Sequence, residues 1–108
     1  MYRIKMITMD LRTGGFDEQF DFGGCINYEV AVKELQKIVR ERAADPLFHV
    51  CVIRDFLFEV SFKMVAGENL LLVYGVEENG SEVDVYEQWI ALNSEGGKEW
   101  NEVQRTRT

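Results

Sequence analysis

The sequence has few of the residues that build metal sites or covalent catalytic sites. Its 108 residues include one histidine, His49, and two cysteines, Cys25 and Cys51. A zinc site of the Cys/His type needs several such ligands at characteristic spacings, so this class of site is excluded. The aspartates do not follow the spacing of a calcium-binding loop, and no glycine-rich segment follows a phosphate-binding pattern. We therefore predict no metal site and no cofactor.

Long apolar runs and a leader segment are also missing. The longest apolar run, LLLVYGV at 70–76, is about a third of the length that spans a membrane. The first residues, MYRIKMITMD, alternate charged and apolar side chains and lack the continuous apolar region of a signal peptide. Without an export signal, two cysteines are expected to be free thiols in a reducing compartment. These features predict a cytoplasmic protein that does not bind membranes.

Proline is scarce as well, which favours one folded domain. The chain has a single proline and 46% apolar residues, a composition unlike that of a disordered segment. A chain of this length can bury one hydrophobic core. We predict a single domain over residues 1–104 and a frayed tail, RTRT, at 105–108.

What is present is a series of short elements with clear periodicity. Residues 2–11 and 16–22 flank the glycines of TGG at 13–15 and predict a hairpin. Asn27 is suited to cap a helix over 28–43, because apolar residues recur there at helical spacing, namely Ala31, Leu35, Ile38 and Val39. Pro46 disfavours helical geometry at the residue before it and ends this helix.

Apolar residues occupy every even position from 48 to 64 except Arg54. One straight strand of that length would span about 55 Å, which is too long for a domain of this size. We therefore expect a reversal around Arg54–Asp55 through an odd-length turn or a sharp bulge. That geometry keeps Val50 and Val52 on the same face as Phe58 and Val60.

Further turns are predicted by AGEN at 66–69 and by ENGSE at 78–82, where Asn79-Gly80 is a strong hairpin signal. The segment after this turn, residues 82–93, is expected to be a strand, with a helix capped by Ser81 as the alternative. For the last part of the chain, a hairpin at Gly96-Gly97 and a short terminal helix both fit.

The predicted order is strand, strand, helix and then four strands joined by tight turns. This order indicates an α+β fold in which an antiparallel β-sheet of about five or six strands packs on one amphipathic helix as a two-layer sandwich. The sheet carries a stripe of phenylalanines that we interpret as core, although it could line an apolar cavity: Phe16, Phe20, Phe22, Phe48, Phe56, Phe58 and Phe62.

One set of residues offers a catalytic alternative. Cys25 precedes a predicted helix N-terminus, where the helix dipole favours a thiolate. His49 follows on the next strand, and Glu59 lies on the strand after that. In topology this order resembles the core of papain-like cysteine peptidases, which implies a nucleophile, a base and an orienting residue. The other interpretation of Cys25 is a small apolar residue that fills space beside the Gly-Gly turn.

Basic residues are scarce in the C-terminal part of the chain. Residues 1–66 contain 9 Lys/Arg and 10 Asp/Glu, whereas residues 67–108 contain 3 and 9, so most of the net charge of −7 lies there. This acidity argues against binding nucleic acid directly, because that needs a basic surface. The acids alternate with aromatic residues, and we predict a partner-binding face formed by Glu77, Glu78, Glu82, Asp84, Tyr86, Glu87, Trp89 and Trp100.

Such a face predicts a non-catalytic, acidic protein-binding module. Electrostatic steering would bring it to a basic, nucleic-acid-binding surface of a partner protein, and an aromatic residue could anchor it. Small acidic α+β chains of this kind include inhibitors and immunity-type proteins, some of them viral proteins encoded by phages; this comparison rests on size and charge. The alternatives are a small cysteine-dependent hydrolase that uses Cys25 and His49, and a structural subunit that self-associates through an exposed sheet edge. The sequence leaves the oligomeric state open.

Overall fold

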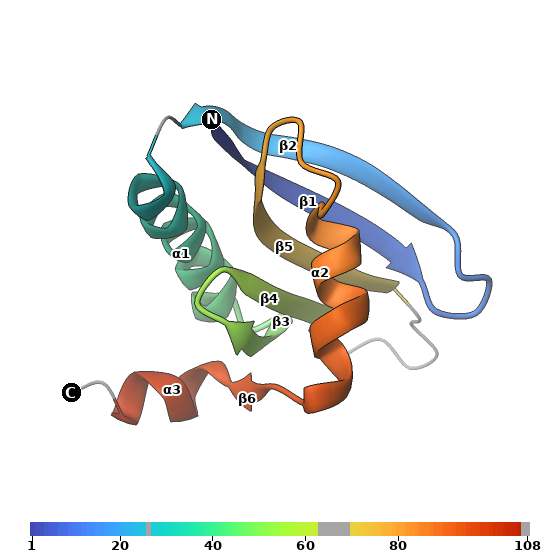
Figure 1. The fold of residues 1–108 in the computed structure, drawn as a ribbon. Helices are drawn as coiled ribbons and strands as arrows, with labels where there is room; N and C mark the ends of the chain where they lie inside the picture. Colours follow the sequence, from blue (N-terminus) through green and yellow to red (C-terminus); the bar gives the residue numbers. More distant parts are fainter. Residues whose placement is uncertain (26, 63–69, 107–108) are drawn as a thin grey trace.

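The computed structural model describes residues 1–25, 27–62 and 70–106. Its six-stranded antiparallel sheet has the strand order β2-β1-β5-β4-β3-β6 (Figure 1). The strands are β1 (Tyr2–Asp10), β2 (Phe16–Cys25), β3 (Phe48–Arg54), β4 (Leu57–Phe62), β5 (Leu70–Glu78) and β6 (Lys98–Glu99). The helices are α1 (Tyr28–Ala44), α2 (Val85–Leu92) and α3 (Trp100–Thr106), with a 3-10 turn at Asn93–Glu95. The predicted α+β class, an antiparallel sheet packed on α1, is confirmed.

The helix α1 forms where its capping residue and its apolar spacing predict it. The side chain of Asn27 accepts a hydrogen bond from the backbone N–H of Glu29 at 2.7 Å and so satisfies one of the free donors of the first turn. The apolar side of the helix is fully buried against the sheet through Ala31, Leu35 and Val39. The helix ends at Ala44, two residues before the proline.

The reversal between β3 and β4 keeps even-numbered residues on one face. Val50 pairs with Val60 and Val52 pairs with Phe58, and an irregularity follows between Val52 and Arg54. A bulge adds one residue to one strand and so restores the register that a two-residue turn would otherwise lose. The predicted sharp bulge and the shared face are therefore confirmed.

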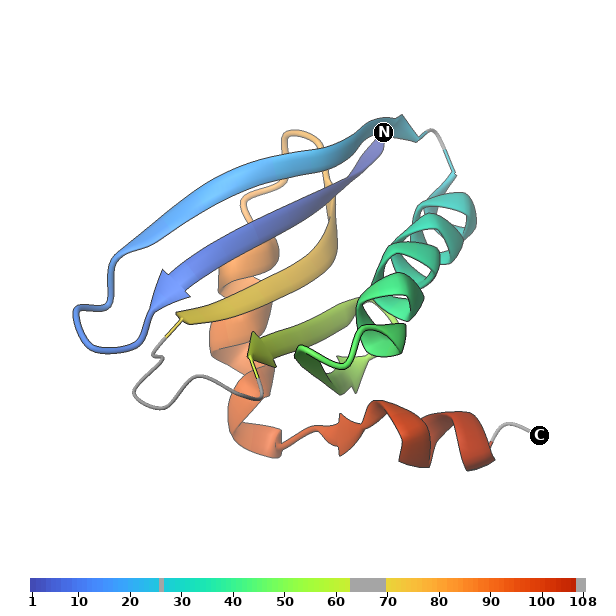
Figure 2. The same ribbon diagram turned by 180° about the vertical axis from the view of Figure 1, so that it is seen from behind.

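Apolar residues cover both faces of the sheet, because α1 packs on one face and α2 on the other (Figures 1 and 2). Ile4 belongs to the cluster formed with α1, whereas Ile7, of opposite parity on β1, belongs to the cluster formed with Val85 of α2. The phenylalanine stripe is divided accordingly. Phe58 is buried in the α1 cluster, and Phe16 is 44% exposed. The side chains of Phe20 and Phe22 lie outside the described part.

The strand expected over residues 82–93 is wrong, and the helix alternative is right. Gly80 adopts the left-handed region with φ of 88°, so the predicted turn forms, but the chain continues into α2 and not into a hairpin. The cap of α2 is Asp84 and not Ser81, since the Asp84 side chain accepts from the backbone N–H of Glu87. The hairpin predicted at 66–69 lies outside the described residues.

The C-terminal segment returns along the outer side of β3. The strand β6 pairs with β3 at Cys51 and Val52, and the expected terminal helix follows as α3. It includes the first two residues of the predicted tail, 105 and 106, whereas 107–108 are not described. Among the described residues, no helix is both long and apolar enough to cross a lipid bilayer.

Candidate functional site

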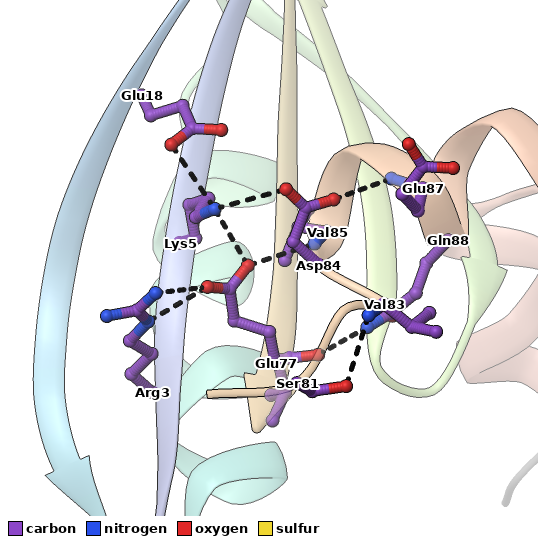
Figure 3. Close-up of polar contacts among 11 residues, drawn as sticks. Arg3, Lys5, Glu18, Glu77, Ser81, Val83, Asp84, Val85, Glu87 and Gln88 are labelled. Carbon is purple, nitrogen blue, oxygen red and sulfur yellow. Dashed lines mark hydrogen bonds and ion pairs between the residues drawn. The ribbon is translucent and has the colours of Figure 1, made fainter. Parts of the chain in front are cut away.

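Two basic residues of β1 and one glutamate of β5 meet under the start of α2 (Figure 3). The Glu77 side chain is 2% exposed and the Lys5 side chain 3%. Lys5 Nζ lies 2.9 Å from Glu77 Oε1, and Arg3 donates through Nε to Glu77 Oε2 at 2.8 Å. Burying charged groups is tolerated when they are paired and hydrogen-bonded, as these three are.

This ion cluster also fixes the first turn of α2. Glu77 Oε1 accepts a hydrogen bond from the backbone N–H of Val85 at 2.9 Å, and Asp84 Oδ2 lies 3.8 Å from Lys5 Nζ (Figure 3). Val85 is fully buried, and its methyl groups would lie 3.0 Å from a Cβ placed on Gly75. The helix therefore begins in direct contact with β5, held by a buried carboxylate and by a close approach that glycine permits.

Lys5 stays protonated in this environment. Burial alone would lower its pKa, but the hydrogen bonds and ion pairs with Glu77 and Glu18 outweigh burial and raise the pKa above its usual 10.5. Lys5 Nζ lies 3.3 Å from Glu18 Oε2, on the neighbouring strand β2. A charged Lys5 thus links three strands, β2, β1 and β5, to the cap of α2.

Three exposed acids lie at the end of β5, in the loop that follows and in the first turn of α2. Glu78, Glu82 and Glu87 are exposed, and none of them forms an ion pair with a described residue. Two hydrogen bonds hold the backbone of this segment. The N–H of Asn79 donates to the carbonyl of Met1 at 2.8 Å, and the N–H of Val83 donates to Ser81 Oγ at 3.1 Å. Between residues 64 and 97 the chain has no lysine, arginine or histidine. We call these three carboxylates the acidic loop surface.

The other members of the predicted partner-binding face have internal partners. Glu77 is buried and cannot contact a partner protein in this conformation, and Asp84 caps α2. The ring of Tyr86 stacks on that of Phe16 with 4.6 Å between centroids, and Trp89 Nε1 donates to Glu59 Oε2 at 2.7 Å.

Trp100 lies apart from that surface, in α3 beyond β6, and its ring is 6.0 Å from that of Phe58. Glu95 and Glu99, on the same side, pair with Arg54 and His49. The structure therefore keeps only part of the predicted face together.

The residues of the catalytic alternative are not brought together. Cys25 lies in β2 and His49 in β3, and the strands β1, β5 and β4 stand between them. At about 4.8 Å per strand this is a separation of roughly 19 Å. His49 Nε2 is paired instead with Glu99 Oε1 at 2.9 Å.

Cys51 has no feature of a nucleophile. It carries a free thiol, whose pKa is raised by burial and then by the nearby carboxylates of Glu59 and Glu99. A raised pKa leaves little reactive thiolate near neutral pH. A disulfide to Cys25 is also ruled out, because four strand spacings exceed the reach of such a bond.

One edge of the sheet, of the kind that the self-association alternative needs, is β2, which pairs on one side only, with β1. Its exposed residues include Asp17 and Glu18. Charged side chains on an edge strand oppose pairing with a second copy. This edge therefore gives no specific support to self-association.

Sequence reasoning missed Arg3 and Lys5 as parts of the site. A signal was present, since the two bases stand two residues apart and so share one face of a strand that also carries Ile7. In the described part, no group of three histidine, cysteine or acidic side chains is placed to hold a metal ion. Comparison with models of known protein families, with curated protein sequences and with solved structures found no match to this chain.

Proposed function

We propose that this protein is a non-catalytic protein-binding module whose acidic loop surface engages a basic surface of a partner protein. The observation that supports the proposal is the placement of Glu78, Glu82 and Glu87 on a loop and helix start that are anchored by the buried pair of Lys5 and Glu77. Because this backbone is already ordered, little conformational entropy is lost when the carboxylates bind.

The lack of basic residues in this stretch of the sequence supports the same function. Residues 64–97 contain no lysine, arginine or histidine, and the nearby Arg3 and Lys5 are paired with Glu77. The field of the exposed carboxylates therefore extends into solvent and attracts positively charged proteins. Surfaces that bind nucleic acid are the most basic protein surfaces, so they are the proposed target. An inhibitor or an immunity-type protein, phage-encoded or cellular, would act in this way. The free thiol of Cys51 is compatible with the reducing cytoplasm as the proposed setting.

The experiment changes the three exposed carboxylates together to glutamine, Glu78→Gln, Glu82→Gln and Glu87→Gln. Asp84 is left intact, because losing the cap would weaken α2 by about 1 kcal/mol and confuse the result. The tagged protein is used to capture binding proteins from a cell lysate at 50 and 300 mM salt, and each captured protein is then purified and its dissociation constant measured. We expect tight binding at 50 mM salt, a steep loss at 300 mM, and loss of binding in the triple variant.

The matched control changes three exposed or half-exposed acids elsewhere, Glu34→Gln, Glu41→Gln and Glu102→Gln, and so has the same net charge. It should bind as the unchanged protein does. If the control loses binding as strongly as the triple variant, net charge alone governs binding and the acidic loop surface is not the site. Binding that is insensitive to salt would also contradict the proposal.

A further inference from the structure

A hollow adjoins the acidic loop surface where β5 extends past β4. The first residue of β4, Leu57, pairs with Gly75, so β5 continues beyond the end of its neighbour. The backbone groups of Val76 are satisfied by the carbonyl of Phe56 at 3.2 Å and by the side-chain amide of Gln88 at 3.0 Å. Beside them opens a hollow of about 430 Å³ between the end of β5, the start of α1 and α2.

The lining of this hollow is mainly apolar and partly open to solvent. Tyr2, Tyr28, Phe56 and Leu92 contribute to it, and so does Val83 from the loop. Val83 is 56% exposed and Tyr28 is 41% exposed. Apolar side chains that line a concavity and remain exposed are characteristic of binding sites.

The charges around the hollow are of one sign. Glu78 and Glu87 of the acidic loop surface line it, and no basic residue in the described part of the chain does. A neighbouring hollow of about 460 Å³ shares Tyr28 and Phe56 but has Lys33 and Arg54 beside its acids. Charge complementarity therefore points to a cationic ligand in the first hollow only.

A third observation concerns Gln88, which also lines this hollow. Its side-chain N–H₂ donates to the carbonyl of Val76, which fixes the orientation of the amide. The buried Oε1 of Gln88 then has no hydrogen-bond partner in the described part of the chain. A buried acceptor without a partner is costly, so a ligand that offered this oxygen a donor would gain binding energy.

We propose that this hollow receives an apolar side chain from a basic segment of the partner protein, flanked by lysines or arginines that pair with Glu78 and Glu87. The inference rests on the proposed function, because it uses the same carboxylates. It adds the chemistry of the recognised segment: an aromatic or large aliphatic residue between cations. Electrostatic attraction would favour association with the partner, and burial of the apolar side chain would give the specificity.

Two capped peptides test this inference, Arg-Lys-Trp-Lys-Arg and Arg-Lys-Ala-Lys-Arg, which differ only in the central side chain. Each is titrated into the isotopically labelled protein at 50 mM salt and followed by backbone amide chemical shifts. We expect the tryptophan peptide to bind about tenfold more tightly than the alanine peptide. Its largest shifts should fall on Val83, Gln88 and Ala91, which all line the hollow.

Two exposed valines give a matched pair of variants. Val83→Ser removes part of the wall, whereas Val30→Ser changes a valine of α1 that is 48% exposed and does not line the hollow. The preference for the tryptophan peptide should fall about fivefold in Val83→Ser and stay unchanged in Val30→Ser.

The outcomes separate this inference from the proposed function. Equal binding of both peptides that is lost in the variant Glu78→Gln, Glu87→Gln would overturn the inference and leave the acidic surface in place. An affinity for the tryptophan peptide that is undiminished in this double variant would overturn both, because the carboxylates would then contribute nothing to binding. No shift with either peptide would overturn the inference, while the lysate experiment decides the proposed function separately.

Discussion

The two C-terminal elements of this protein are attached to the same sheet by ion pairs in very different surroundings. At the start of α2, the paired side chains of Lys5 and Glu77 are 3% and 2% exposed. Just before β6, the paired side chains of Arg54 and Glu95 are 37% and 55% exposed. Exposed pairs contribute about 0–1 kcal/mol, whereas removing one partner of a buried pair costs about 3–5 kcal/mol. The buried ion pair therefore holds α2 on the sheet, whereas the exposed pair contributes little to the position of β6.

The largest effect is expected from Glu77→Gln. This change leaves Lys5, which is almost fully buried, without its closest carboxylate, and it weakens the bond to the N–H of Val85. The free energy of unfolding should fall by about 3–5 kcal/mol, measured by urea denaturation. The neighbouring variant Glu78→Gln is the control, because that residue is exposed, and it should stay within about 0.5 kcal/mol of the unchanged protein. If Glu77→Gln and Glu78→Gln lower the free energy of unfolding equally, burial of the carboxylate does not determine the loss, and the prediction is contradicted.

The pair of Lys5 and Glu77 can also be tested by raising the pH until Lys5 loses its proton. Since the pKa of Lys5 is raised in the folded protein, its stabilising contribution is complete below the usual lysine value of 10.5. That contribution is lost as the pH rises through the higher folded pKa. We expect the free energy of unfolding to decline above pH 10.5 more steeply than in Lys5→Met. The variant removes the contribution of Lys5 but keeps those of Tyr28 and Cys51, whose pKa values are also raised, mainly by burial. If the free energy of unfolding falls with pH equally steeply in the unchanged protein and in Lys5→Met, this prediction is contradicted.

On the side of β6, close packing is expected to matter more than charge. A Cβ on Gly97 would lie 2.5 Å from Cys51 Sγ and 2.8 Å from Ile53 Cδ1. Gly97→Ala should therefore displace β6 and lower the free energy of unfolding by about 1–3 kcal/mol. A thermal melt compared with that of Ser94→Ala, an exposed change nearby, measures the effect. An unchanged melting temperature would mean that β6 is not packed as closely as described.

The smallest effect is expected from Glu95→Gln. Glu95 pairs with Arg54, but their side chains are 55% and 37% exposed. Solvent weakens such a pair, so the loss should be below about 1 kcal/mol and should vanish at high salt. A loss comparable to that of Glu77→Gln in the same urea experiment would remove the contrast between the two regions.

Much of the fold could be predicted because several local signals agreed. Asn27 and Pro46 marked the two ends of α1, and the parity of residues 48–62 fixed how β3 pairs with β4. The strand prediction for residues 82–93 was wrong because alternating acids and apolar residues also fit a short helix. The Asn79-Gly80 signal predicted a turn correctly, but a turn does not determine which element follows it.

The site was less predictable, because the sequence gives the number of charged residues but does not show which of them are buried. Glu77 and Glu78 are adjacent and chemically identical, yet only Glu77 points toward Lys5 and the interior. The difference arises from strand alternation, combined with α2, which covers the face of the sheet that carries Glu77. Covering both faces also explains why apolar residues of both parities, Ile4 and Ile7, are fully buried on β1.

The proposed function requires that the carboxylates of Glu78, Glu82 and Glu87 stand on an ordered backbone. Backbone ¹⁵N relaxation over residues 78–87 tests it most directly. We expect order parameters of about 0.85, equal to those of β5. Values below about 0.6 would mean that the loop moves freely on the nanosecond timescale, which would contradict a preformed acidic surface.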